Sequence, residues 1–243
     1  MLKGFGIDFA GYSTGKTSLA FVEIDSSSAK ATLLRKSALS TIRNSADDLE
    51  DALRQDVMVL RRCFAVGPIA VDIPIDLQGL PTPQNPRAIW ELTRRPIDRA
   101  VNAMPPFADR IGAPVARFAA VMREGKFEEL LGRTLFEAYP AATLRMLKIK
   151  AGSYKGPSGS DTLISLCKTL NIESGVENDD DIDAIICAIT AALPTDMMHG
   201  REAFKFEGPM PKGFRIPKQL AFEKIQVIES EFNDWMNSRE GVA

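Results

Sequence analysis

The chain has 243 residues, of which 45% are hydrophobic and 26% charged, a composition typical of an ordinary soluble globular protein. Its formal net charge of −2 excludes a global basic field that would recruit nucleic acid, although a local basic groove is compatible with it. No apolar run approaches the roughly 18 residues of a membrane helix, and the sequence starts without a signal-peptide pattern. We therefore expect a cytoplasmic protein with no membrane partner.

The cysteine and histidine residues are few and widely scattered, which bears on zinc sites and on Ser–His–Asp triads. The three cysteines are widely spaced and fit no zinc-binding pattern, so we expect reduced thiols. The single histidine, His199, lies outside every motif described below, and a Ser–His–Asp triad would have to use it.

The first third of the sequence predicts three strands joined by short polar turns. Apolar residues run over 5–9, and apolar and β-branched residues run over 17–24 and 31–39. Ser45 then heads a predicted helix, and another apolar strand is expected within residues 68–75. The three early strands form an antiparallel meander.

Residues 76–114 lose this periodicity and are rich in proline and arginine, which is typical of an inserted functional loop or of a disordered segment. The elements expected after it are a helix over 115–131, a strand over 133–139, and helices over 141–148, 160–170 and 178–193. This order predicts an α/β fold, with a mixed sheet of three antiparallel strands followed by parallel strands and helices on both faces.

We assign residues 1–198 to one domain, with the insertion at about 76–114, and residues 199–243 to a C-terminal extension. Apolar residues recur at helical spacing over 218–235, so an amphipathic helix packed on the same domain is expected there.

Residues 10–17, AGYSTGKT, fit a relaxed phosphate-loop pattern with alanine at the first glycine position. A true phosphate loop is followed by a helix, because the helix N-terminus and the loop amides hold the phosphates. The residues that follow here predict a strand. We therefore interpret the segment as the turn of a hairpin.

Single carboxylates accompany three of the predicted strands. Asp8 and Asp72 each lie near the end of an apolar run, and Glu137 lies within another. Ionised acids are rarely buried unless they are paired or bind a metal.

The helix expected over 178–193 opens with the acids of DDDID at residues 179–183. Asp179 and Asp183 are four residues apart and share a helix face, with Asp180 beside them. A purely structural role is the alternative, because acids in a first turn gain about 0.3–1 kcal/mol each from the helix dipole.

If this helix packs over the strand ends, the carboxylates converge. Converging carboxylates favour hard divalent cations, which predicts Mg²⁺ or Mn²⁺ as the cofactor. Two such ions about 3.5–4 Å apart would activate water and stabilise the leaving oxygen of a phosphoryl displacement. That is the chemistry of a nuclease or a phosphatase.

Five runs in order, GIDFAG, AVDIPI, RRPIDR, FEAYP and DDDIDAIICAITA, resemble the family catalogued as domain of unknown function 429. The resemblance spans about residues 4–195. The family is described as a predicted nuclease with a ribonuclease H-like fold, so the resemblance implies that fold and that activity. The acidic site residues that it implies are Asp8, Asp72, Glu137, Asp180 and Asp183, with Asp179 as the first acid of the helix motif. Of these, the expected metal ligands are Asp8, Asp72, Asp180 and Asp183.

The resemblance also marks basic residues that could contact substrate phosphates. Arg95, Arg99 and Lys155 are the expected substrate-binding residues. For the arginines, pairing with Asp98 and other acids of the insertion is the alternative.

Three functions are open at this point. The first is a metal-dependent nuclease or phosphodiesterase that acts on nucleic acid. The second is an ATP- or phosphate-binding protein like sugar kinases and actin-like ATPases, which share this sheet topology. The third is a binding protein whose acids are vestigial. The sequence predicts neither the substrate nor the oligomeric state.

Overall fold

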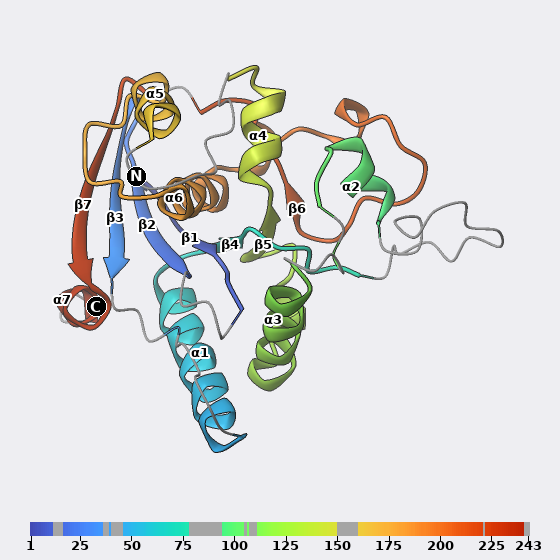
Figure 1. Ribbon diagram of the computed structural model, residues 1–243, viewed down its shortest axis with the longest axis vertical. Coiled ribbons are helices and arrows are strands. Elements are labelled where there is room, and N and C mark those ends of the chain that lie inside the picture. The colour runs from blue at the N-terminus through green and yellow to red at the C-terminus, as the bar shows by residue number, and fades with distance from the viewer. Residues whose placement is uncertain are drawn as a thin grey trace.

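The computed structural model describes residues 1–11, 17–35, 39, 46–77, 94–104, 106, 111–149, 160–220 and 222–240. Its centre is a seven-stranded sheet with the order β6-β5-β4-β1-β2-β3-β7 (Figure 1). The strands are β1 (Leu2–Asp8), β2 (Ser18–Ile24), β3 (Ser28–Arg35), β4 (Ile69–Val71), β5 (Leu135–Ala138), β6 (Phe214–Arg215) and β7 (Lys224–Glu231). The predicted α/β fold with a mixed sheet is confirmed.

Antiparallel pairing joins β1, β2 and β3, and the other neighbouring strands are parallel. β1 pairs with β2 from Leu2 opposite Ile24 to Asp8 opposite Ser18. On its other side β1 is parallel to β4, and β4 is parallel to β5. The carboxyl ends of β1, β4 and β5 therefore meet at one edge of the sheet, which is where ligands bind in open α/β sheets.

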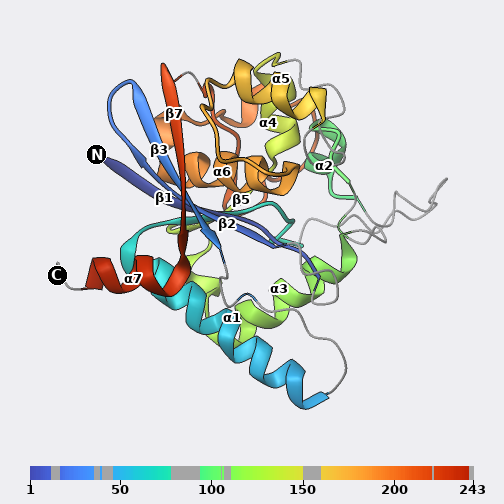
Figure 2. The same ribbon diagram turned by 60° about the vertical axis from the view of Figure 1, so that its left-hand side comes forward.

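Helices cover both faces of the sheet (Figure 2). One face carries α4 (Pro140–Met146), α5 (Asp161–Thr169) and α6 (Asp179–Ala192), and the other carries α1 (Ala46–Val66), α3 (Gly112–Gly125) and α7 (Phe232–Glu240). The short α2 (Pro96–Ala100) packs in a small apolar cluster with residues of α4 and β6. Within the described residues, no helix combines the length and apolar character needed to cross a membrane.

α6 lies directly on β1 because two glycines of the strand leave room for the helix backbone. A Cβ atom at Gly6 would lie 2.0 Å from the carbonyl oxygen of Ala184 and 2.1 Å from the nitrogen of Ala188. At Gly4 it would lie 2.6 Å from the same Ala188's carbonyl oxygen. Only glycine at these positions permits such an approach. The contact sets the height and rotation of α6 over the strand.

The predicted helix over 218–235 is wrong. Residues 224–231 form β7, which pairs in parallel with β3 over its full length, and the helix begins only at Phe232. Buried Ile225 and Val227 alternate with exposed Lys224 and Gln226, which is the period of a strand. Pairing with the edge of β3 outweighs the helical spacing of the apolar residues. The C-terminal extension thus contributes β6 and β7 to the main sheet.

An ion pair fastens the last turn of α7 to β2. The two terminal nitrogens of Arg239 each donate to a carboxylate oxygen of Glu23 at 2.9 Å. This hydrogen bonding is the largest influence on Glu23 and lowers its pKa below the ordinary 4.5. Because the folded pKa lies below the unfolded one, the pair stabilises the protein above about pH 4.5 and the stabilisation is lost as the pH falls through the folded pKa.

We therefore expect Glu23→Gln to lower the free energy of unfolding at neutral pH by up to about 1 kcal/mol, since the pair is partly exposed. The difference from wild type should shrink as the pH falls below 4.5. Urea denaturation at neutral and acidic pH measures both effects. Glu50→Gln, which alters an exposed pair with Arg54 on α1, is the control. A pH-independent difference would contradict the prediction.

Candidate metal centre

Asp8 and Asp72 are brought together by the parallel pairing of β1 and β4. Asp8 is the last residue of β1, and Asp72 directly follows β4. Ile7 lies opposite Val71 in the register, and the amide nitrogen of Asp72 donates to the carbonyl oxygen of Ile7 at 2.9 Å. The two carboxylates therefore emerge side by side, as their positions at adjacent strand ends predict.

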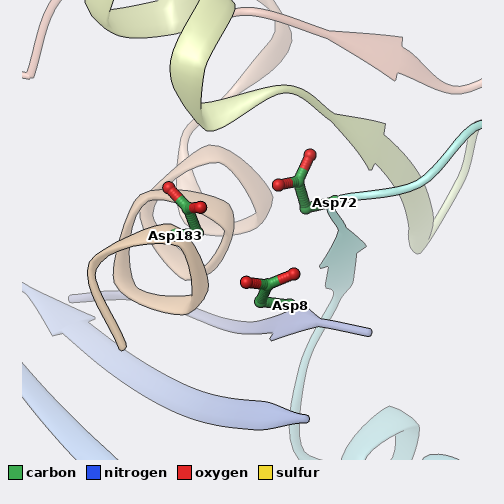
Figure 3. Close-up of side chains that lie close together, drawn as sticks. All are labelled: Asp8, Asp72 and Asp183. Carbon is green, nitrogen blue, oxygen red and sulfur yellow. The ribbon is translucent and has the colours of Figure 1, made fainter. Parts of the chain in front are cut away.

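Asp183 joins them from α6. It is fully buried near the start of the helix, next to Ala184, whose carbonyl oxygen faces Gly6 of β1. Figure 3 shows Asp8, Asp72 and Asp183 together at the edge of the sheet. One carboxylate oxygen from each lies within 4.8 Å of the others. Three segments far apart in the sequence thus supply one acidic cluster.

The donor set suits a hard divalent cation. Carboxylate oxygens are the ligands that Mg²⁺ and Mn²⁺ prefer, and Mg²⁺ is usually held by one or two carboxylates with water completing its shell. Asp8 and Asp72 are half-buried, and Asp183 is buried. Among the described residues, no second group of acids, histidines or cysteines gathers in this way.

Asp180 and Asp179, in the first turn of α6, are half-buried and are not part of the three-residue group. The prediction that Asp180 binds metal beside Asp183 stays a prediction.

Asp181 has a different role, which the sequence did not reveal. Its side chain is fully buried and accepts hydrogen bonds from both terminal nitrogens of Arg35, at 2.7 and 2.9 Å. The hydroxyl of Ser18 and the amide of Glu177 donate to it as well. Asp181 therefore ties the start of α6 to β2 and β3, and its charge is compensated by Arg35.

Glu137 lies at the same sheet edge, but its carboxylate is engaged by Arg95. Val71 lies opposite Glu137 in the β4–β5 register, and Glu137 is fully buried. Its Oε1 and Oε2 accept from Nη2 and Nη1 of Arg95 at 2.6 and 3.0 Å. Oε2 also accepts from the amide of Ile75 at 2.6 Å. Both oxygens of this predicted catalytic acid thus have partners within the protein.

Arg95 is an internal cation in the structure, in contrast to the predicted contact with substrate phosphates. It is fully buried, and besides Glu137 it donates to Asp98, to the Tyr139 hydroxyl and to the carbonyl oxygen of Asp76. Burial raises the pKa of Tyr139 well above its ordinary value, so its hydroxyl stays protonated and donates to Asp98 at 3.0 Å. The alternative left open for Arg95, pairing with Asp98, is the one present.

Of the other predicted substrate-binding residues, the structure describes Arg99. Arg99 lies on α2 and is exposed. It is distant in sequence from the three aspartates. Lys155 and residues 12–16 of the turn fall outside the described residues. β2 begins at Ser18, so a strand and not a helix follows that turn, as expected for a hairpin.

Comparison with known proteins found no family model, no curated protein and no solved structure that matches this chain. The assignment of the centre rests on the positions of Asp8, Asp72 and Asp183.

Proposed function

We propose that this protein is a divalent-cation-dependent phosphodiesterase that hydrolyses nucleic acid, with a ribonuclease H-like fold. The observation that carries the proposal is the meeting of Asp8, Asp72 and Asp183 at the carboxyl edge of the sheet. The sheet order supports it, because antiparallel β1, β2 and β3 are followed by parallel β4 and β5, as the sequence resemblance implies. Mg²⁺ or Mn²⁺ is the proposed cofactor.

Asp8, Asp72 and Asp183 would hold the cation. When bound, a divalent ion lowers the pKa of a coordinated water and neutralises charge on the oxygens of a phosphodiester. Asp183 keeps a fixed position because α6 is packed on β1 through Gly6. Asp8 and Asp72 are half-buried, whereas Asp183 is buried, so we assign to Asp8 and Asp72 the side from which a nucleic-acid backbone would approach. Exposed Arg99 is the basic residue of α2 that we assign to substrate phosphates.

We also place the protein in the cytoplasm. Within the described residues, Cys63, Cys167 and Cys187 are not joined to one another by disulfides. Burial raises the pKa values of Cys63 and Cys167, which keeps both thiols protonated and unreactive. Cysteines that form no disulfide are typical of a reducing compartment.

Asp8→Asn tests the proposed reaction. Wild type should cleave single-stranded, duplex or branched nucleic acid only with Mg²⁺ or Mn²⁺, and the variant should lose at least about 100-fold in rate because a ligand charge is removed. Mn²⁺ at about 100 times its Kd should also stabilise wild type by about 2.7 kcal/mol and leave Asp8→Asn unchanged.

Asp161→Asn, which alters an exposed acid in the first turn of α5, is the matched control and should behave as wild type. Wild-type protein that cleaves none of these substrates and gains no stability with Mn²⁺ would overturn the proposal. ATP-induced stabilisation without cleavage would favour the nucleotide-binding alternative.

A further inference from the structure

A buried ion pair lies behind the strand end that carries Asp8. Arg117 of α3 is 4% exposed, and Asp56 of α1 is fully buried. Nε and Nη2 of Arg117 donate to the two carboxylate oxygens of Asp56, each at 2.8 Å. This bidentate arrangement fixes the plane of the guanidinium group. Asp56 therefore determines where the third nitrogen of Arg117 points.

That third nitrogen faces the backbone that follows Asp8. Nη1 of Arg117 donates to the carbonyl oxygen of Ala10 at 2.9 Å and to the Thr17 hydroxyl at 3.4 Å. The same hydroxyl accepts from the amide of Ala10 at 3.1 Å. The guanidinium carbon also lies 4.4 Å from the centroid of the Phe9 ring, a cation–π contact. One arginine thus contacts both sides of the hairpin turn directly after Asp8.

We propose that Arg117 is a positioning residue for Asp8, and that Asp56 orients it. The inference rests on the proposed function, because what Arg117 positions is a ligand of the candidate metal centre. By holding Phe9 and Ala10, Arg117 fixes the chain direction at the end of β1 and hence the aim of the Asp8 carboxylate.

A purely architectural pair would have no need of these contacts. Joining α1 to α3 requires only the Arg117–Asp56 bonds, and buried ion pairs are a costly way to stabilise a fold compared with apolar packing. The contacts of Nη1 with Ala10 and Thr17 add restraint directly after the end of β1, which bears the candidate ligand Asp8. A ligand displaced by a fraction of an ångström binds a cation less well, so this restraint affects affinity.

Mn²⁺ affinity measured by isothermal titration calorimetry on the folded protein tests the role of Arg117. Arg117→Lys keeps a positive charge but lacks the planar guanidinium group that donates to Asp56 and to Ala10 at the same time. We therefore expect Mn²⁺ to bind at least about tenfold more weakly. If that variant does not fold, the double variant Asp56→Leu with Arg117→Met removes both buried charges together and should show the same loss.

Val59→Ala is the matched control, because Val59 is a fully buried residue of α1 whose truncation lowers stability without touching the turn. Its Mn²⁺ affinity should equal that of wild type. Wild-type affinity in the Arg117 variants would overturn the positioning role and leave the metal centre intact. No Mn²⁺ binding by wild type would overturn the proposed function and the positioning role together.

Discussion

Replacing Gly6 with alanine is expected to lower the free energy of unfolding by about 3 kcal/mol or more, the upper end of the range for overpacked cores. The added Cβ would lie 2.0 and 2.1 Å from backbone atoms of Ala184 and Ala188. Backbone atoms cannot turn aside as a side chain can, so α6 must move away from β1. Because Asp183 is carried by α6, the same change should weaken Mn²⁺ binding.

Gly112→Ala is the control for this experiment. A Cβ at Gly112, the first residue of α3, has nothing within 4 Å, and alanine is the better helix former. The substitution should therefore leave stability unchanged or raise it by up to about 1 kcal/mol. Urea denaturation of the two variants, with and without Mn²⁺, measures the effects. A wild-type unfolding midpoint for Gly6→Ala would show that α6 is not held as closely as described.

The acid cluster can be predicted from the sequence only in part. The ends of apolar runs mark the strand ends directly, whereas the rotation of α6 about its own axis is indicated much less directly. Asp8 and Asp72 end apolar runs, and parallel pairing places such ends together. Which acids of DDDID turn inward depends on the rotation of α6, and a shift of two residues along a helix turns a side chain through about 200°. Hence Asp183 reaches the cluster and Asp181 reaches Arg35.

A signal for that rotation does exist in the sequence. Gly4 and Gly6 lie on one face of β1, and Ala184 and Ala188 are four residues apart on α6. Small residues at these two periods permit close contact between a strand and a helix, and Asp183 directly precedes the first alanine. Apolar periodicity alone does not distinguish this pairing from other ways of placing an apolar helix on the sheet.

The remaining failures come from partners that are distant in the sequence. The pairing of Arg95 with Glu137 depends on the path of the insertion between them, which its proline-rich sequence does not specify. For residues 224–231, the spacing of the apolar residues fits both a helix and a strand. The segment becomes a strand because it pairs with the edge of β3. Local pattern predicts elements well here, but it does not predict which buried charges meet.

Removing Arg95 is the second substitution with a large expected effect. Arg95→Met leaves the carboxylates of Glu137 and Asp98 fully buried without their cation, and breaking a buried pair in this way typically costs about 3–5 kcal/mol. Arg99→Met on α2, the short helix that directly follows Arg95, removes an exposed guanidinium and should change stability by less than about 0.5 kcal/mol. Chemical denaturation measures the free energy of unfolding of both variants. Equal losses in the two would contradict the buried ion pairs of Arg95 with Glu137 and Asp98.

Glu137→Gln then separates two roles for Glu137. If Glu137 acts through Arg95 and Ile75, it anchors the segment that follows Asp72, because Arg95 also holds the carbonyl oxygen of Asp76. A glutamine oxygen in the place of Oε2 can still accept from Ile75 and from Nη1 of Arg95, but the amide nitrogen cannot accept from Nη2. The variant should therefore lose stability but keep Mn²⁺ affinity within about twofold of wild type. If Glu137 is itself a ligand, affinity should fall as far as in Asp8→Asn. We expect the first result, since both oxygens of Glu137 already accept hydrogen bonds inside the protein.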